Sequence, residues 1–285
     1  MPFDLHAYLA RIGFTGATRP SLSTLTALHQ AHVCTIPFEN LDVLLDRPIH
    51  LESEAIQEKL VVARRGGYCY EQNALFLMAL QQMGFDARGL AARVVIAQPP
   101  SVPPRTHMLL LIQLEEAFWI ADVGFGGPTL SAPLCLQADR VQSTPWGSWQ
   151  LQSLGEEWLL CKQSGNDWLP LYRFDLVTQY PSDYLMANHF VSSWPHSHFR
   201  HHLVAARYLP DGGQLALENR RFSRYGAQPE RRSLDDLRAL YQLLQDEFRL
   251  GMKHSLYGIE EDAFIQAMTR LEAEARAGAE PGYTD

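Results

Sequence analysis

Cysteine is scarce in this sequence, and the four that occur, Cys34, Cys69, Cys135 and Cys161, lie far apart. There is no CxxC pair and no dense cysteine framework, so the sequence favours neither a structural zinc site nor a disulfide scaffold. Sparse, unpaired cysteines are typical of proteins in a reducing compartment. We therefore expect a cytoplasmic location.

Long apolar runs, a basic leader and an excess of positive charge are also missing. The opening stretch MPFDLHAYLARIGF lacks a small-residue cleavage site, and no run approaches a membrane span, so we expect neither a signal peptide nor a membrane partner. The 24 Lys and Arg against 32 Asp and Glu leave a net charge of −8. A general nucleic-acid binder would need a basic surface, so any anionic ligand must find a local positive site.

Helical periodicity dominates the first third of the chain. Apolar residues recur at helical spacing in residues 5–12, in the segment after Ser21 and in the segment after Ser53. The stretch CYEQNALFLMALQQM begins at Cys69, ends before Gly84 and is apolar around most of its axis. We expect a buried central helix there, with Gly84 as its C-terminal cap.

Strand patterns begin at about residue 88. The stretches GLAARVVIA, HMLLLIQL and AFWIADVGF combine β-branched, aromatic and leucine residues without helical caps. Shorter candidates follow in SWQLQSL, EWLLCKQ and WLPLYRFD. Their spacing predicts an antiparallel sheet or small barrel rather than alternating βαβ units.

The pattern is mixed after about residue 190. It predicts two strands around the Asp211-Gly212-Gly213 turn, a helix capped by Ser233 and a last helix near residues 259–276. The final PGYTD is typical of a frayed end. At 285 residues the chain exceeds the usual size of one compact domain, so we expect two or three sub-structures that share an interface.

The stretch RGGYCYEQN, residues 65–73, places Cys69 just after a glycine turn and at the start of the expected central helix. The unpaired N–H groups and the dipole of a helix start favour an anion, so a thiol ionises more readily there and becomes nucleophilic. Gly66 and Gly67 permit a close approach in which backbone N–H groups could also stabilise an oxyanion. A small buried hydrophobe is the alternative interpretation of this thiol, and Cys34, Cys135 and Cys161 are interpreted in that way.

A nucleophilic thiol needs a base, and His107 is the candidate with the clearest geometry. His107 begins one expected strand and Asp122 ends the next. If Leu114 pairs with Ala117 in the hairpin, Asp122 is the diagonal neighbour of His107 on the same face, at a Cβ separation of roughly 7 Å. The carboxylate would hold one imidazole nitrogen while the other addresses Cys69. A buried pair without a catalytic role is the alternative interpretation.

Four separated motifs resemble those of the arylamine N-acetyltransferases: RGGYCYEQN, PPRTHMLLL, ADVGFGG and PFENLDV. The resemblance runs from HAYL near the start, through SHFRHHL and LPDGG, to at least residue 250. It implies an α+β fold with a cysteine-protease-like core: a helical bundle (1–84), an antiparallel β-barrel (85–190) and a linker with an α/β lid (191–285). It also implies that Cys69, His107 and Asp122 are the catalytic triad of an acetyl-coenzyme A dependent enzyme.

The resemblance further implies ping-pong transfer of an acetyl group from coenzyme A to arylamines or hydrazines, with O-acetylation of N-hydroxyarylamines as a further candidate reaction. Within it, GFGGPT (124–129) is a backbone nest for coenzyme A phosphates. From the residues alone, the same stretch could be a plain turn. The residues assigned to coenzyme A are Gly124, Gly126, Gly127 and Thr129, and those assigned to the aromatic acceptor pocket are Phe125, Phe38 and Phe199.

Two further clusters are interpreted structurally. The stretch WPHSHFRHH holds His196, His198, His201 and His202, but no carboxylate or cysteine accompanies these histidines on a strand face, so we expect no metal. Glu39 and Asn40 are expected to brace the active site, Glu39 through Arg64 or Arg65.

Two other functions stay open at this stage. A cysteine hydrolase or transglutaminase-like enzyme could use the same triad, because fold and triad do not choose the acceptor. A non-enzymatic protein that binds aromatic small molecules in the same cavity is the second alternative.

Overall fold

The N-terminal part of the structure is helical. The structure is a computed structural model that describes residues 3–99 and 101–279. Its first elements are α1 (Leu5–Ile12), α2 (Leu22–Thr35), the short strand β1 (Phe38–Glu39), α3 (Leu41–Leu44), α4 (Ser53–Gln57), the π-helical turn η1 (Glu58–Val62) and α5 (Cys69–Gln82).

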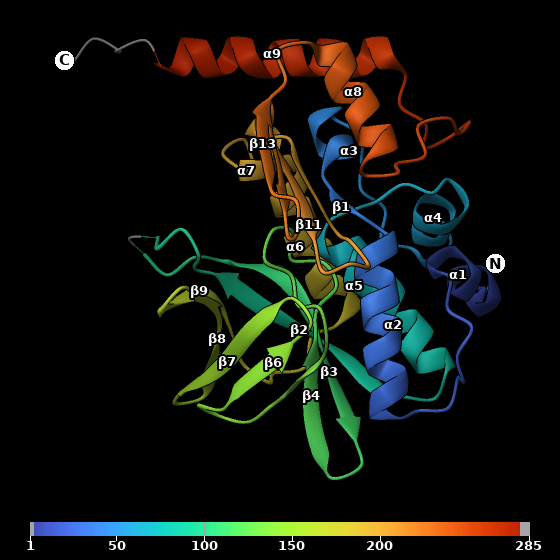
Figure 1. Ribbon diagram of the computed structural model, residues 1–285, viewed down its shortest axis with the longest axis vertical. Helices are drawn as coiled ribbons and strands as arrows, with labels where there is room; N and C mark the ends of the chain where they lie inside the picture. The colour runs from blue at the N-terminus through green and yellow to red at the C-terminus, as the bar shows by residue number, and fades with distance from the viewer. Residues whose placement is uncertain (1–2, 100, 280–285) are drawn as a thin grey trace.

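The predicted starts and ends of these helices are confirmed. The Ser21 hydroxyl accepts a hydrogen bond from the Thr24 N–H at 3.1 Å and caps α2. Gly84, with φ of +85°, follows the last turn of α5. Because side chains around most of the α5 circumference are buried, α5 is the central helix of this part (Figure 1).

The middle of the chain forms an antiparallel eight-stranded sheet that curls into a barrel, seen at the lower left in Figure 1, beside α2. Its strands are β2 (Asp86–Val94), β3 (Arg105–Leu114), β4 (Ala117–Ala121), β5 (Leu134–Cys135), β6 (Val141–Thr144), β7 (Gly147–Leu154), β8 (Glu157–Ser164) and β9 (Asp167–Phe174). They follow the order β5-β4-β3-β2-β9-β8-β7-β6.

A side chain joins the two edge strands of this barrel. The Gln142 amide of β6 accepts from the Cys135 N–H of β5 and donates to the Cys135 carbonyl, both at 2.8 Å. These two hydrogen bonds replace backbone bonds that β5 and β6 do not make with each other. The barrel is therefore nearly closed.

The C-terminal part holds a second sheet. Its elements are α6 (Pro181–Ser193), α7 (His198–His201), β10 (Val204–Tyr208), β11 (Gln214–Glu218), β12 (Arg221–Tyr225), β13 (Glu230–Ser233), α8 (Leu237–Asp246) and α9 (Glu261–Ala279). The sheet order is β1-β10-β11-β12-β13, so β1 of the N-terminal part forms its edge, with Phe38 opposite Ala206.

Two predictions for this part were incomplete or wrong, and a third is not tested. The chain continues from the expected hairpin into β12 and β13. Ser233 does not cap the helix, because it pairs with Arg221 in the sheet; α8 begins later, and its cap is Asp236, which accepts from the Arg238 N–H at 3.0 Å. The PGYTD stretch lies outside the described residues.

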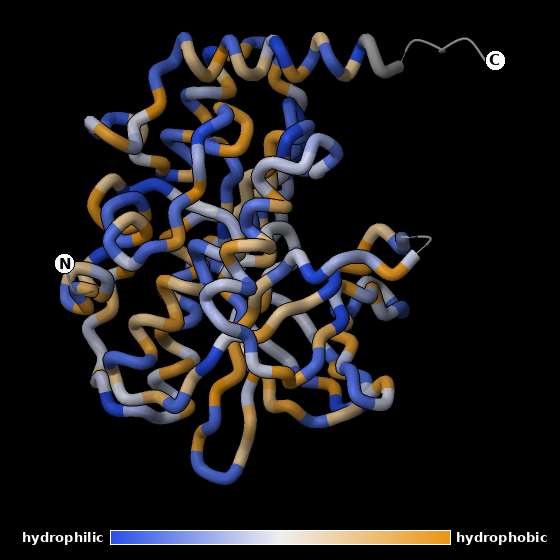
Figure 2. Tube along the Cα trace, turned by 180° about the vertical axis from the view of Figure 1, so that it is seen from behind, coloured by the Kyte–Doolittle hydropathy of each residue, from blue (hydrophilic) through white to orange (hydrophobic). Residues whose placement is uncertain are grey.

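Three apolar clusters hold the fold together. One lies between the N-terminal helices and β2, β3 and β4, a second fills the barrel, and a third joins the C-terminal sheet to α3, α8 and α9. Apolar and polar residues alternate along α9 in Figure 2, and its buried face includes Phe264, Met268 and Leu271. The expected α+β class is confirmed, whereas the boundaries 1–84, 85–190 and 191–285 stay a prediction.

In the part of the chain that is described, no helix combines the length and apolar character needed to cross a membrane.

Candidate active site

Cys69 is the first residue of α5, at the place where sequence reasoning put it. The Glu71 carboxylate accepts from the Tyr68 N–H at 3.1 Å and fixes the entry of the chain into the helix. Cys69 is buried, and its Sγ lies 3.8 Å from the Thr106 carbonyl oxygen, just before His107 in β3. First-turn N–H groups have no partner within a helix, so donors for a bound anion are available at this position.

The two glycines before Cys69 allow close contacts that a side chain would prevent. A Cβ at Gly66 would lie 2.1 Å from the Pro37 carbonyl oxygen, and a Cβ at Gly67 would lie 2.6 Å from a Glu71 carboxylate oxygen. The predicted tight approach is therefore made to Pro37, just before β1, and to the Glu71 carboxylate. The role of backbone N–H groups near these glycines as oxyanion donors stays a prediction.

His107 and Asp122 meet as the hairpin geometry predicted. Leu114 pairs with Ala117, and the ladder continues to Leu110 opposite Ala121. Asp122 follows β4 directly, and its Oδ2 lies 2.8 Å from the His107 Nε2. Both side chains are buried, so water does not compete for this bond.

The electrostatics of the pair favour its charged form. Burial lowers the pKa of the His107 imidazole, but the Asp122 carboxylate and a hydrogen bond with Cys69 outweigh it and raise the pKa to about 10. Burial likewise disfavours the Asp122 carboxylate, yet His107 and hydrogen bonds from Asn73 and Gly124 hold its pKa below the ordinary value. At neutral pH the pair is an imidazolium beside a carboxylate, and the hydrogen bond with Cys69 is left to the second imidazole nitrogen.

Asn73 supports the His107–Asp122 pair, and sequence reasoning missed it. Its Nδ2 donates to Asp122 Oδ1 at 3.0 Å and to the Met108 carbonyl at 2.8 Å, and its Oδ1 accepts from the Val123 N–H at 3.1 Å. The available signal was its position four residues after Cys69, on the same face of α5. Asn73 therefore ties the helix that begins at Cys69 to the segments that carry His107 and Asp122.

Replacing Asn73 by Ala is expected to lower kcat/KM about 10- to 100-fold, as for the loss of one hydrogen bond to a charged group. The change leaves Asp122 with one donor fewer and the buried Val123 N–H without its acceptor, so the imidazole loses its fixed orientation. Steady-state kinetics of N73A and of Gln82→Ala, an exposed position at the end of the same helix, measure the effect. Equal rates for the two variants would contradict this role.

The loop 124–129 lies against the start of α5. A Cβ at Gly124 would lie 3.0 Å from the Cys69 Cα, and the Gly124 N–H donates to Asp122 Oδ1 at 3.0 Å. Gly126 has φ of +102°, and its N–H donates to the Thr129 hydroxyl, which in turn donates to the Gly126 carbonyl at 2.8 Å. The Gly127 carbonyl accepts from the Gln214 amide. The loop is thus folded on itself and held to β11.

The predicted aromatic residues lie in two places. The Phe125 ring lies 5.1 Å from that of His107, and the Tyr172 ring, which sequence reasoning missed, lies 4.9 Å from it. The Phe199 ring lies 5.8 Å from Phe38 and 6.0 Å from Tyr68. Phe125 therefore contacts His107, whereas Phe38 and Phe199 pack beside Tyr68, the residue before Cys69.

Asn40 and Glu39 brace the site, as expected. The Asn40 amide donates to the Phe199 and His202 carbonyls at 2.8 and 2.7 Å, which fixes the segment that carries Phe199. Glu39 Oε1 accepts from Arg65 Nη2 at 2.8 Å, so Arg65 rather than the exposed Arg64 is its partner.

This ion pair belongs to a larger buried network. Lys59 Nζ lies 2.6 Å from Asp42 and 2.7 Å from Glu71, and Arg65 also approaches Asp42 at 3.3 Å. The network therefore links β1, α3 and η1 to Glu71, the residue that caps the helix of Cys69.

The histidine-rich stretch forms a helical turn, not the strand that the alternation suggested. The rings of His198 and His202 stack at 4.2 Å, as residues four apart on a helix can. Across residues 3–99 and 101–279, no group of three or more His, Cys, Asp or Glu side chains could hold a metal ion.

Known proteins resemble this chain in both sequence and fold. A family described as N-acetyltransferase matches residues 21–257. The "Arylamine N-acetyltransferase" of Escherichia coli (strain K12) is 49% identical over 276 residues, 96% of this chain and 98% of that protein. A Salmonella typhimurium protein named "Arylamine N-acetyltransferase / N-hydroxyarylamine O-acetyltransferase" is 48% identical with the same coverage.

Two solved structures of such proteins have a fold similar to that of this chain. That of the Salmonella typhimurium arylamine N-acetyltransferase has a TM-score of 0.91 at 48% identity and covers 93% of this chain and 98% of its own. The Mycobacterium marinum arylamine N-acetyltransferase in complex with CoA has a TM-score of 0.89 at 36% identity, covering 94% and 99%.

Proposed function

This chain belongs to the arylamine N-acetyltransferase family, and we propose on that premise that it moves an acetyl group from acetyl-coenzyme A to arylamines and hydrazines through a thioester on Cys69. Membership of this family makes the chain an acetyltransferase. The name of the 48% identical Salmonella relative also supports O-acetylation of N-hydroxyarylamines. The single observation that carries the residue roles is the buried His107–Asp122 pair beside Cys69 at the start of α5.

In the first half-reaction, the Cys69 thiolate attacks the thioester carbonyl carbon of acetyl-coenzyme A. The carbonyl oxygen becomes negative in the tetrahedral intermediate, and helix-start N–H groups are suitable donors to it. The bond between the carbonyl carbon and the coenzyme sulfur then breaks. The His107 imidazolium gives its proton to the departing thiolate, which leaves acetyl-Cys69, neutral His107 and free coenzyme A.

In the second half-reaction, the amine nitrogen attacks the acetyl group on Cys69. Neutral His107 takes the proton that this nitrogen loses, the bond to the Cys69 sulfur breaks, and the ion pair of imidazolium and thiolate is restored. An arylamine suits this step because it is largely unprotonated at neutral pH. Phe125, Phe38 and Phe199 are proposed to contact its ring, and an aromatic wall supports stacking.

Acetyl-coenzyme A is the proposed donor because the family is an acetyltransferase family and a relative binds CoA in its solved structure. The loop 124–129, with Gly124, Gly126, Gly127 and Thr129, is the proposed contact with it. Gly127 supports this assignment, because a Cβ there would meet nothing within 4 Å, which leaves room for a ligand.

Intact-mass spectrometry after incubation with acetyl-coenzyme A and no amine tests the function. Wild type should gain one acetyl group and Cys69→Ala none; equal gain by both would refute the thioester. Rapid hydrolysis of the acetyl-enzyme without an amine would favour the hydrolase alternative. Absence of both acetylation and turnover, with ligand binding by Cys69→Ser unchanged, would favour the binding protein.

Iodoacetamide is expected to alkylate Cys69 rapidly at pH 6, where an ordinary free thiol, with a pKa of about 8.5, is almost fully protonated. The reason is the imidazolium of His107, whose pKa of about 10 keeps it charged far above that pH. Peptide mapping reports the label on Cys69 separately from that on Cys34, whose thiol stays protonated at pH 6 because burial raises its pKa to about 11. A His107→Gln variant whose Cys69 reacted as fast as wild type from pH 6 to 9 would count against the ion pair.

A further inference from the structure

Two buried histidines of α2 take no part in the two half-reactions. His29 and His32 are three residues apart on one face of the helix, and both are fully buried. Their rings lie 5.8 and 5.6 Å from that of Phe76 in α5. Burial lowers the pKa of His29 to about 4 and that of His32 to about 3. Both imidazoles are therefore neutral at neutral pH, and in each of them one nitrogen can donate while the other accepts.

His32 is the centre of a chain of hydrogen bonds with a fixed direction. Its Nε2 lies 2.7 Å from Gln72 Oε1, and its Nδ1 lies 2.9 Å from the Tyr8 hydroxyl oxygen. The Gln72 amide nitrogen donates to the Pro37 carbonyl at 2.7 Å and to the Gly67 carbonyl at 3.2 Å. Because the amide oxygen only accepts, Nε2 carries the proton and Nδ1 accepts from Tyr8. The chain of bonds therefore ends in the glycine turn that precedes α5.

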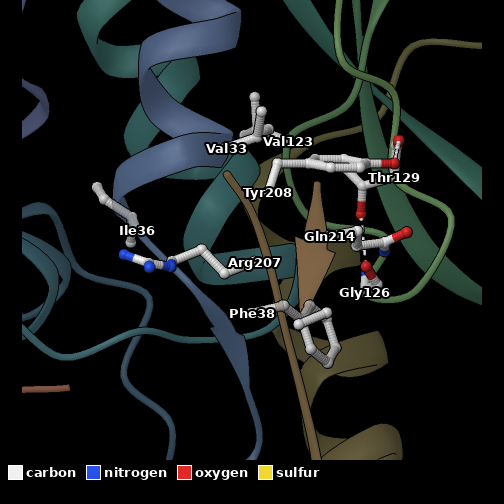
Figure 3. A pocket seen from close by; sticks show the side chains of 10 residues that line it. Val33, Ile36, Phe38, Val123, Gly126, Thr129, Arg207, Tyr208 and Gln214 are labelled. Carbon is white, nitrogen blue, oxygen red and sulfur yellow. Dashed lines mark hydrogen bonds between the residues drawn. The ribbon is translucent and has the colours of Figure 1, made fainter. Parts of the chain in front are cut away.

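His29 contacts the opposite side of the site. Its Nε2 accepts from the Asp122 N–H at 3.3 Å, so its proton lies on Nδ1. That Nδ1 is buried and has no hydrogen-bond partner among the described residues, which costs free energy. An apolar side chain would fill this position without that cost, so the bond to Asp122 is what the imidazole contributes. Figure 3 shows Val33 of α2 and Val123, which follows Asp122, on the wall of one small cavity, so α2 runs beside the segment that carries the carboxylate.

We propose that His29 and His32 are positioning residues for acetyl transfer, an inference that rests on the proposed function. His29 acts on the backbone of Asp122, and His32 acts through Gln72 on the turn before Cys69. Because both bonds start from one helix, α2 sets the distance between the nucleophile and the carboxylate that orients its base. A displacement of about 1 Å can cost about 10²-fold in rate. The loss of either bond alone should cost less than that, since the other bond remains.

Removing either imidazole should slow the chemical step without weakening the binding of acetyl-coenzyme A. In His29→Leu and His32→Leu, acetyl-Cys69 should form about 3- to 10-fold more slowly at saturating acetyl-coenzyme A, as for the loss of one hydrogen bond. Quenched intact-mass spectrometry measures this rate and its dependence on donor concentration. His29→Gln and His32→Gln should stay within about twofold of wild type, because the Gln amide ends near the place of Nε2. His6→Leu, the same change at an exposed position of α1, is the control and should match wild type.

A double variant separates positioning from a loss of stability. If His29 acts through Asp122, adding His29→Leu to Asp122→Asn should change the acetylation rate by less than about twofold, since the carboxylate that it positions is already absent. Urea unfolding of each variant reports stability separately. Should a Leu variant fail to fold, two milder variants replace it and should show the same slowing. Tyr8→Phe removes only the hydroxyl that donates to His32, and the side chain in His29→Asn is too short to reach the Asp122 N–H.

Three results would overturn the positioning role: Leu variants that acetylate as fast as wild type, a loss confined to the affinity for acetyl-coenzyme A, or an undiminished effect of His29→Leu in Asp122→Asn. A wild type that gains no acetyl group would refute the proposed function instead. Alkylation of Cys69 by iodoacetamide at pH 6 then tests the inference without an acetyl donor. His29→Leu and His32→Leu should react about 3- to 10-fold more slowly than wild type, and His6→Leu equally fast; equal rates for all of them would overturn it.

Discussion

Replacing Asp122 by Asn is expected to reduce kcat/KM by about 10⁴-fold, the size of effect that follows when a triad imidazole is held in the wrong tautomer. Asp122 accepts from three donors: His107 Nε2, the Asn73 amide and the Gly124 N–H. A carboxamide has one oxygen, so if that oxygen keeps Asn73 and Gly124, its NH₂ group must face His107.

The imidazole must then accept at Nε2 and carry its proton on Nδ1, the nitrogen that faces the thiol. It can no longer take a proton from Cys69. Burial, which lowers the pKa of His107, would also act without an opposing carboxylate, so the imidazolium would be lost at neutral pH. Both effects remove the ion pair while leaving the fold intact.

Steady-state acetyl transfer by Asp122→Asn measures this effect, with Asp167→Asn at an exposed barrel turn as the matched control. A variant that kept more than about a tenth of wild-type kcat/KM would show that the carboxylate does not set the tautomer. The alkylation of Cys69 at pH 6 should fall in parallel. In wild type the stabilising contribution of protonated His107 is complete below its ordinary pKa of about 6.5 and is lost as the pH rises through about 10.

Arg65→Met is expected to lower the free energy of unfolding by about 3–5 kcal/mol, the cost of removing one partner from a buried ion pair. Arg65 is completely buried and pairs with Glu39 and Asp42. Without it, those two carboxylates share Lys59 with Glu71. A charged group that loses its partner in the interior has no water to solvate it, so its burial costs free energy.

Urea unfolding of Arg65→Met against Arg64→Met isolates the buried charge, because the neighbouring Arg64 is exposed and forms no ion pair within the described part of the chain. Similar stabilities for the two variants would contradict the argument. Adding Glu39→Gln to Arg65→Met should recover part of the loss, since the amide oxygen can still accept from the Leu41 N–H while the unpaired charge disappears.

Arg65→Met should also change how the free energy of unfolding depends on pH under acidic conditions. Burial disfavours the Asp42 carboxylate, but Lys59 and Arg65 outweigh it and lower its pKa from 3.8 to about 2. Its contribution to stability is therefore present above pH 3.8 and is lost as the pH falls through about 2. Loss of Arg65 should move that decline to higher pH, which unfolding at pH 3 to 5 would detect.

Local sequence patterns predict much of the site without reference to tertiary contacts. The start of α5 at Cys69 follows from a glycine turn before an apolar helical run, and its end follows from Gly84. The pairing of His107 with Asp122 follows from strict alternation and an even hairpin turn, because a shift of one residue would have put the two on opposite faces. These features depend on neighbours in the chain, so the sequence alone could predict them.

Contacts between distant segments were decided by tertiary structure. Sequence reasoning missed the bond from Asn73 to Asp122, the network through Lys59, and the pairing of Phe38 with Ala206 that makes β1 an edge of the C-terminal sheet. The predicted N-terminal cap of α8, Ser233, was also wrong, because nothing in the local sequence showed that this residue would pair with Arg221. Side chains that form such contacts carry no periodicity or spacing of their own, and their partners are chosen only when the helices, the barrel and the second sheet pack together.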